Sequence, residues 1–227
     1  MGPGWSWSDW YGCKRMELVS RVVGPVATNV VILGDPRTRE AIAIDTAIPS
    51  LAFVIDELAA RDWTLKLIVS THGHWDHIGD NAAVAAHTGA PIAVHPLDRD
   101  RLEHPGGGMA PFAIPPSIPA VDLAEGGMIR FGDMRFEVLH TPGHTEGSVC
   151  LFERDAGQLL SGDTLFAGGW GRVDLPGGSA TELAASLARL AGIGDSVRVM
   201  PGHGPPTTIG RERAWLDLVV AGGRLFA

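Results

Sequence analysis

Apolar residues in the first half of the chain fall into short runs, most of which have the β-branched composition of strands. Two other stretches, residues 49–58 and 78–88, repeat their apolar residues at helical spacing, and the first of them opens with Pro49, a residue favoured in the first turn of a helix. The predicted strands cover residues 19–23, 28–33, 41–44, 66–70 and 91–95. The alternation of strands and helices predicts an α/β fold.

The second half of the chain resumes this alternation after one interruption. Residues 104–119 are rich in Pro and Gly, which predicts a loop without regular structure near the mouth of a site. Ser179-x-x-Glu182 is a capping-box pattern that predicts the start of a helix, and a last helix is expected around Leu216. Further strands are predicted at residues 128–131 and 135–140, and in two runs that end at Phe152 and Leu160.

Length and composition predict one domain with a sizeable core, because 45% of the 227 residues are apolar. We expect this domain to cover residues 16–227. Residues 1–15 are rich in Trp and Gly and are interpreted as an N-terminal arm. The arm lacks the pattern of a signal peptide. It is either a flexible leader or a segment that docks its aromatic residues on the surface or on a partner, and we favour docking because exposed Trp clusters are rare without a use.

The charge of the chain excludes some classes of partner. A formal net charge of −8 gives no electrostatic basis for binding nucleic acid, and no apolar run approaches the length of a membrane span. The two cysteines, Cys13 and Cys150, lack the spacing of a metal site, and this usage fits a reducing cytoplasm. We therefore expect a cytoplasmic protein with a small-molecule substrate and no nucleic-acid or membrane partner, and leave a homodimer open.

Residues 71–80, THGHWDHIGD, are the most informative segment. They place His72, His74, Asp76 and His77 within six positions after a predicted strand. A core segment would leave these polar side chains unsatisfied, and a helix would spread them around its circumference. A loop that leaves the strand can direct them to one point, which predicts a metal site. The alternative is a solvated, His-rich turn.

Three later segments repeat one arrangement: an apolar run, a turn with Gly or Pro, and a residue able to bind a metal. These residues are His144, Asp163 and His203. Strands that end at one edge of a sheet can bring such residues to one point. A single His is more often structural than a ligand, but the recurrence favours a shared site.

With these segments the chain resembles the metallo-β-lactamase fold superfamily, over most of its length from Val26 to the C-terminal helix. The resemblance implies an αββα sandwich, in which two sheets are covered by outer helices. It implies that one metal ion is held by His72, His74 and His144, that a second is held by Asp76, His77 and His203, and that Asp163 bridges the two. Imidazole and carboxylate ligands suit zinc, iron or manganese, and we expect two divalent ions, with zinc favoured.

A pair of cations implies hydrolysis. Two metal ions lower the pKa of a water held between them and so supply hydroxide near neutral pH. The hydroxide attacks a carbonyl, and no Ser or Cys nucleophile is required; no G-x-S-x-G pattern is present. Asp76 and Asp163 are the expected catalytic residues. Asp163 is expected to set the positions of both metal ions, and Asp76 to orient the nucleophile.

Within the superfamily, the stretches 162–166 and 171–178 look like glyoxalase II-like hydrolases, which predicts hydrolysis of thioesters or esters. Secreted β-lactamases lack the bridging Asp and carry export signals, which argues against antibiotic hydrolysis as the main role. The alternatives are a persulfide dioxygenase with one iron on His72, His144 and Asp163, a lactonase, or a non-enzymatic metal-binding or interaction module. A non-enzymatic module would be expected to lack some of the metal ligands, and this chain lacks none of them.

Two substrate contacts are expected, at Arg172 and Phe112. Glyoxalase II enzymes hold glutathione with a Lys and a Tyr where this chain has Arg172 and Asp174, and they add a C-terminal helical region that is absent here. We interpret Arg172–Asp174 chiefly as a structural pair and expect little preference for glutathione. Phe112, with Met109 and Ile114, is expected to border the substrate entrance. Asp45 is either a supporting carboxylate for the site or a turn residue, and His140 is expected to be structural.

Overall fold

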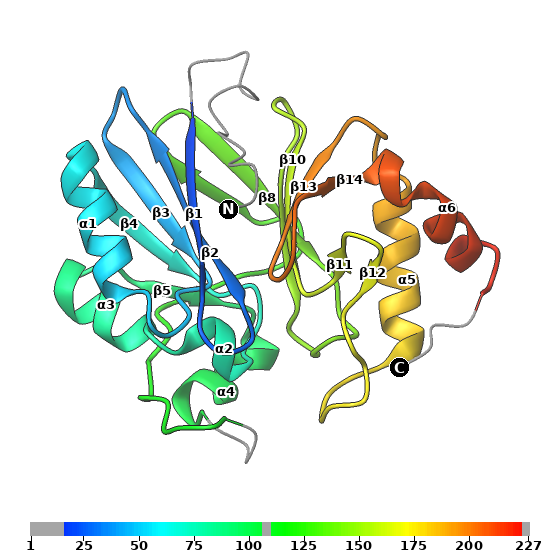
Figure 1. Ribbon diagram of the computed structural model, residues 1–227, viewed down its shortest axis with the longest axis horizontal. Helices are drawn as coiled ribbons and strands as arrows, with labels where there is room; N and C mark the ends of the chain where they lie inside the picture. The colour runs from blue at the N-terminus through cyan, green and yellow to red at the C-terminus, as the bar shows by residue number, and fades with distance from the viewer. Residues whose placement is uncertain (1–15, 106–109, 224–227) are drawn as a thin grey trace.

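Two six-stranded sheets lie face to face in the computed structural model of the chain, which describes residues 16–105 and 110–223 (Figure 1). The first sheet has the order β1–β2–β3–β4–β5–β6. Its strands are Glu17–Val23 (β1), Thr28–Asp35 (β2), Glu40–Ile44 (β3), Thr64–Val69 (β4), Ile92–Val94 (β5) and Val121–Asp122 (β6). The β1–β2–β3 pairs are antiparallel, and the pairs from β3 to β6 are parallel.

The second sheet has the order β14–β13–β10–β9–β8–β7 and contains one parallel pair, β10 with β13. Its strands are Met128–Phe131 (β7), Met134–His140 (β8), Val149–Glu153 (β9), Gln158–Gly162 (β10), Arg198–Pro201 (β13) and Thr207–Thr208 (β14). A short hairpin of Leu165–Phe166 (β11) and Gly169–Trp170 (β12) follows β10.

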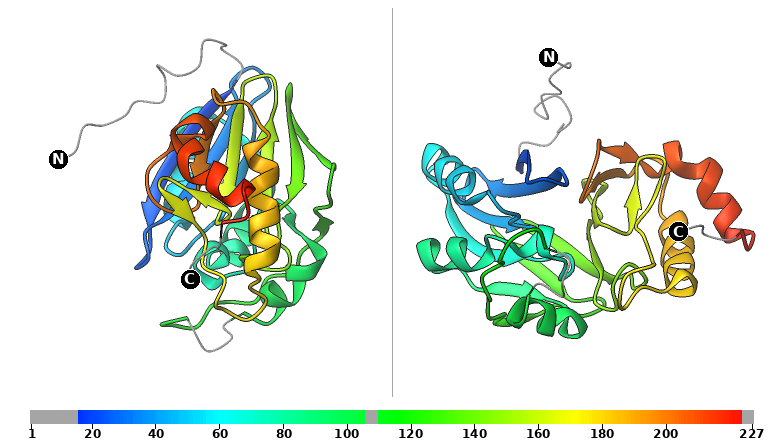
Figure 2. Two further views of the ribbon diagram at one scale, coloured as in Figure 1. Left: turned by 90° about the vertical axis from the view of Figure 1, so that its right-hand side faces the viewer. Right: turned by 60° about the horizontal axis from the view of Figure 1, so that its bottom comes forward.

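Helices cover the outer face of each sheet, so the layers run helix, sheet, sheet, helix (Figures 1 and 2). The first sheet is covered by α1 (Leu51–Arg61) and α3 (Asn81–Thr88), and the second by α5 (Ala180–Ala191) and α6 (Ile209–Val220). Three short helices, α2 (Trp75–Ile78), η2 (Pro96–Asp98) and α4 (Arg99–Glu103), lie at one end of the sandwich. The predicted αββα architecture is confirmed.

Strand β2 shows how the sequence separates the layers. Val30 and Ile32 belong to the cluster beneath α1 and α3, whereas Val31 and Leu33 belong to the cluster between the sheets. The alternation is the period of two that a strand with both faces buried requires. Between the sheets, side chains such as Phe136 are completely buried, and each contributes roughly 1.5–3 kcal/mol to folding.

One predicted helix differs from the structure in detail. The helix expected over residues 78–88 begins only at Asn81, and the four-residue α2 precedes it. The helix is interrupted at Gly79 and Asp80. Gly79 packs against Ile48, and Asp80 Oδ2 accepts hydrogen bonds from the backbone N–H groups of Ser50 and Leu51. Asp76 and His77 therefore lie in a helical turn, so the expectation that the whole motif is a loop was wrong.

The remaining element predictions are largely confirmed. Ser179 Oγ accepts a hydrogen bond from the backbone N–H of Glu182, as the capping box predicts, and its own N–H donates to Gly143 O. Residues 105 and 110–119 contain no helix or strand. The N-terminal arm, Cys13 and Met109 lie outside the described residues. No helix in the described part of the chain has both the length and the apolar composition needed to span a membrane.

Candidate metal centre

The ligand residues predicted from sequence follow the ends of four strands, at the end of the sandwich where α2 lies (Figure 1). His72 and His74 follow β4, and α2 adds Asp76 and His77 directly after them. The other three residues follow β8, β10 and β13 and are His144, Asp163 and His203. All seven converge, although they come from both sheets.

The first group consists of three buried imidazoles, His72, His74 and His144, whose nearest nitrogen atoms lie within 4.8 Å of one another. The closest pair, His74 Nδ1 and His144 Nε2, is 2.8 Å apart. Burial lowers the pKa of His74 to about 3 and holds the pKa values of His72 and His144 below their usual value as well. Neutral imidazoles present the lone pairs that a metal ion needs.

The second group consists of Asp76, His77 and His203, with ligand atoms again within 4.8 Å of one another. His77 Nε2 and His203 Nε2 are 3.1 Å apart, and His203 Nε2 is 3.2 Å from Asp76 Oδ2. Asp163 lies between the groups: its Oδ2 is 3.5 Å from His144 Nε2 and 3.4 Å from His203 Nε2. The carboxylate therefore has the position expected of a bridging ligand.

The two groups differ in charge. Burial opposes protonation of His203, but hydrogen bonds to Asp163 and Asp76 outweigh it and raise its pKa to about 9. Burial likewise opposes charge on Asp163, but the neighbouring His77 and the hydrogen bonds from His203 and His77 together outweigh it and lower its pKa well below the usual value. The carboxylates thus favour positive charge beside them, whether it is carried by protons or by a metal ion.

The donor set fits a pair of divalent ions. His72 Nε2 and Asp163 Oδ1 are buried without a hydrogen-bond partner among the described residues, which is costly for polar atoms unless a cation binds them. Five imidazoles and two carboxylates suit zinc, iron or manganese. The donor set does not distinguish among these metals.

The ring nitrogens that point away from the cluster are held in the manner of metal-bound histidines. His77 Nδ1 is 2.9 Å from Asp45 Oδ2, His144 Nδ1 is 2.8 Å from Arg172 O, and His203 Nδ1 is 3.1 Å from Val26 O. Donation by these N–H groups leaves each Nε2 free to bind a metal.

Asp45 supports the site in two ways. Besides His77, its carboxylate accepts hydrogen bonds from the backbone N–H of Thr71, at 2.7 Å, and from Thr71 Oγ1, at 2.8 Å. Of the two alternatives left open by the sequence, the structure supports the first, since Asp45 fixes both a ligand and the loop that precedes His72.

A second supporting residue, Asn29, was not anticipated. Asn29 Nδ2 donates to the carbonyl oxygens of Pro201 and Gly204, both at 2.9 Å, and so holds the turn that carries His203. The available signal was an amide side chain directly before the apolar run of residues 30–33 in strand β2.

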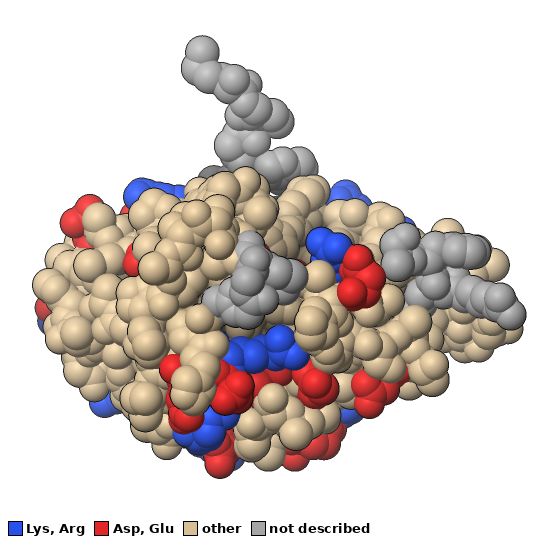
Figure 3. Space-filling view, turned by 90° about the horizontal axis from the view of Figure 1, so that it is seen from below, with Lys and Arg blue, Asp and Glu red and all other residues tan. Residues whose placement is uncertain are grey.

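A cleft of about 530 Å³ opens onto the cluster. Besides the predicted ligands His74, Asp76, His144, Asp163 and His203, it is lined by Val26, Trp75, Phe166, Arg172 and Leu175. Arg172 thus lies where a substrate contact was predicted. Phe112 does not line the cleft; its ring packs edge to face against Trp75, at 5.7 Å between centroids. Seen from this end, the surface carries acidic and basic side chains next to one another (Figure 3).

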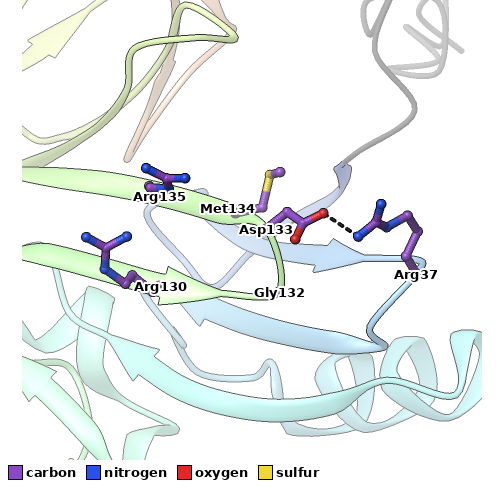
Figure 4. Close-up of a pocket in the computed structure, with 6 residues that line it drawn as sticks. All are labelled: Arg37, Arg130, Gly132, Asp133, Met134 and Arg135. Carbon is purple, nitrogen blue, oxygen red and sulfur yellow. Dashed lines mark ion pairs between the residues drawn. The ribbon is translucent and has the colours of Figure 1, made fainter.

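A second hollow, of about 450 Å³, lies at the β7–β8 turn, at the opposite end of β8 from His144 (Figure 4). Arg130 and Arg135 point from the two strands into it, and Asp133 pairs with Arg37 at 2.5 Å. One carboxylate and no imidazole line this hollow, so it offers no comparable set of metal ligands.

Two other side chains assessed from the sequence lie apart from the cluster. His140 stacks on His95 at 4.1 Å and its Nε2 donates to Glu146 O, in agreement with a structural role. Cys150 is completely buried in β9, and burial raises the pKa of its thiol to about 11.

Comparison with known proteins agrees with this geometry. The model of the Metallo-beta-lactamase superfamily matches residues 23–203. The chain belongs to this superfamily. An uncharacterized protein of Aquifex aeolicus is 40% identical over 197 residues, which is 85% of this chain and 92% of that protein. A hydroxyacylglutathione hydrolase of Maricaulis maris is 36% identical over 172 residues, which covers 76% of this chain and 60% of the relative.

Solved structures of the superfamily share the fold. The BLEG-1 B3 metallo-beta-lactamase is 33% identical with a TM-score of 0.81, over 87% of this chain and 97% of that one. TTHA1623 in a di-iron-bound form is 35% identical with a TM-score of 0.75, over 86% of this chain and 96% of that one. ETHE1 from Myxococcus xanthus is 28% identical with a TM-score of 0.75, over 90% of this chain and 85% of that one.

Proposed function

We propose that the protein is a hydrolase of thioesters or esters, of the glyoxalase II type, that works with two divalent metal ions. The observation that carries the proposal is the position of Asp163 between two groups of three ligands. The hydroxyacylglutathione hydrolase relative supports the thioester, and the di-iron form of TTHA1623 supports a site for two ions.

His72, His74 and His144 would hold one ion, Asp76, His77 and His203 the other, and Asp163 both. Such a pair supplies Lewis acidity and lowers the pKa of a water molecule between its members. Asp76 Oδ2 lies 3.2 Å from His203 Nε2 at the cleft and would be placed to orient such a water molecule. The oxygen of the water bonds to the acyl carbon, the bond from that carbon to sulfur or oxygen breaks, and the leaving group takes up a proton.

Side-chain nucleophiles play no part in this proposal. The residues that line the cleft include no Ser or Cys. Cys150 is buried beneath the surface, where its thiol stays neutral. The attacking group is therefore water.

The second candidate is oxygenation of a persulfide on a single iron held by His72, His144 and Asp163. The similarity to ETHE1 from Myxococcus xanthus favours this candidate. Against it, Asp76, His77 and His203 form a complete second group. Lactones remain candidate substrates, and the similarity to the BLEG-1 enzyme makes a β-lactam a necessary test compound. A small-molecule substrate and a cytoplasmic location remain part of the proposal.

Metal analysis combined with a substrate panel tests the proposal. The purified chain is expected to hold two ions of zinc, iron or manganese and to cleave a thioester faster than a lactone or a β-lactam. The same protein, given a persulfide, should consume no oxygen. One iron per chain together with oxygen uptake would replace the hydrolase by the oxygenase.

A further inference from the structure

A buried carboxylate outside the ligand cluster joins the two loops that carry the first ligand group. Asp98, at the end of η2, is completely buried. Its Oδ2 accepts hydrogen bonds from Gly73 N and from Thr145 Oγ1, both at 2.7 Å, and its Oδ1 accepts one from Gly147 N at 3.0 Å. Gly73 lies between His72 and His74, and Thr145 directly follows His144.

Arg101 extends the same connection to the cleft wall. Its Nε is 3.4 Å from Asp98 Oδ1, and its Nη2 donates to Glu146 Oε2 and to Pro176 O, both at 2.8 Å. Pro176 belongs to the turn whose earlier residues Arg172 and Leu175 line the cleft. One side chain pair therefore contacts three segments around the first ligand group.

The packing leaves little room for these segments to move. A Cβ atom at Gly73 would lie 2.6 Å from Arg101 Cβ, and a Cβ atom at Gly147 would lie 2.6 Å from Asp98 Cγ. Both distances are shorter than side chains tolerate, so glycine is required for the backbone to approach Asp98 and Arg101 this closely.

The contacts of Asp98 also determine its role. Three N–H or O–H donors and Arg101 surround its two oxygen atoms, and none of these four partners is an imidazole. Its negative charge strengthens each of these hydrogen bonds, because charge-assisted bonds are roughly twice as strong as neutral ones. A carboxylate occupied in this way serves to hold backbone in place and is not available to a metal ion.

We propose that Asp98 is a positioning residue that fixes the loop of His72 and His74 against the loop of His144, and thereby sets the metal affinity of this ligand group. The inference rests on the proposed function only in so far as that group binds a metal ion. Supporting residues of metal sites typically change affinity or activity 10–100-fold when they are replaced.

Stepwise zinc affinity, measured by competition with a chromophoric chelator, tests the role of Asp98. The Asp98→Asn variant keeps the shape but loses the charge and one acceptor, and we expect one of the two zinc affinities to fall about 10–100-fold while the other stays within threefold. Asp100→Asn is the matched control: Asp100 lies two residues further along, in α4, its side chain is 86% exposed, and its partner is His104. Both affinities of this control should match the wild type.

Two further comparisons identify the affected site. In a His144→Ala background the first group is already incomplete, so Asp98→Asn should cause no further loss of zinc affinity. Thr145→Val removes the hydroxyl that donates to Asp98 and should weaken the same affinity, whereas Thr145→Ser keeps the hydroxyl and should restore it. The Thr145 pair decides the question if Asp98→Asn does not fold.

Each outcome has one meaning. Two unchanged affinities in Asp98→Asn, together with a lower melting temperature, would make Asp98 a purely structural residue and overturn the inference. Equal loss at both sites would also overturn it. A wild-type chain that binds no zinc, iron or manganese would overturn the proposed function and this inference together, whereas two bound metals without any hydrolysis would contradict the proposed function alone.

Discussion

Arg172 and Asp174 form a two-bonded ion pair, with Arg172 Nε 2.7 Å from Asp174 Oδ1 and Arg172 Nη2 2.7 Å from Oδ2. The hydrogen bonds from Arg172 lower the pKa of the exposed Asp174 to about 2, so the carboxylate is ionised at any physiological pH. Arg172 lines the cleft, but Asp174 already occupies the forked face of its guanidinium. The pair is therefore poorly suited to hold the carboxylates of glutathione.

We expect little preference for glutathione as the leaving thiol. The ratio of kcat/KM for lactoylglutathione to kcat/KM for an N-acetylcysteamine thioester should stay below about a hundredfold, or about 2.7 kcal/mol. In Asp174→Asn the guanidinium loses its anionic partner, so the ratio should rise. A wild-type ratio far above a hundredfold, or a fall in the variant, would show that glutathione is recognised here after all.

The Asp163→Ala variant should lose hydrolytic activity and bind fewer metal ions, while its secondary structure is retained. The Asp163 carboxylate lies against both ligand groups, and its removal leaves three imidazoles without a shared anion. Metal content by mass spectrometry, circular dichroism and thioester turnover measure the three effects. Near-normal turnover in a variant that is fully loaded with metal would exclude Asp163 from the reaction.

The convergence of these side chains could be predicted from the sequence because its signals are local. His144, Asp163 and His203 each follow an apolar run and a turn, and the edge of a sheet brings strand ends together without further information. The break between α2 and α3 was not predictable in this way. It depends on the packing of Gly79 against Ile48, which is distant in sequence.

Asp98 was missed for the same physical reason. Its partners Gly73 and Thr145 lie 25 and 47 positions away, and nothing in the segment around Asp98 indicates them. Phe112 is an intermediate case. The Pro- and Gly-rich composition correctly predicted a loop. Composition alone does not predict that Phe112 packs against Trp75 instead of lining the cleft itself.

Cys150 should resist thiol reagents in the folded protein. Burial raises the pKa of its thiol to about 11, so at pH 8 the reactive thiolate is scarce, and the sulfur atom has no access to solvent. A Cys13→Ser variant isolates Cys150 for the measurement. Its reaction with Ellman's reagent at pH 8 should be slow in buffer and complete in denaturant, and rapid labelling without denaturant would contradict the buried position.

Replacement of Phe112 should alter substrate binding through Trp75. The Phe112 side chain is 41% exposed, so its removal costs little core packing, but its ring supports the edge of Trp75, which does line the cleft. An aromatic pair of this kind contributes about 0.5–1.5 kcal/mol beyond the area that it buries. We therefore expect Phe112→Ala to raise KM about two- to tenfold for thioesters with large apolar acyl groups, with kcat nearly unchanged because no metal ligand moves.

Phe112→Tyr keeps the ring and serves as the matched control. Equal kinetics for Phe112→Ala and wild type on every accepted substrate would reduce the loop to a surface feature, whereas a loss of kcat with loss of metal would mean that Trp75 transmits the change to His74 and Asp76.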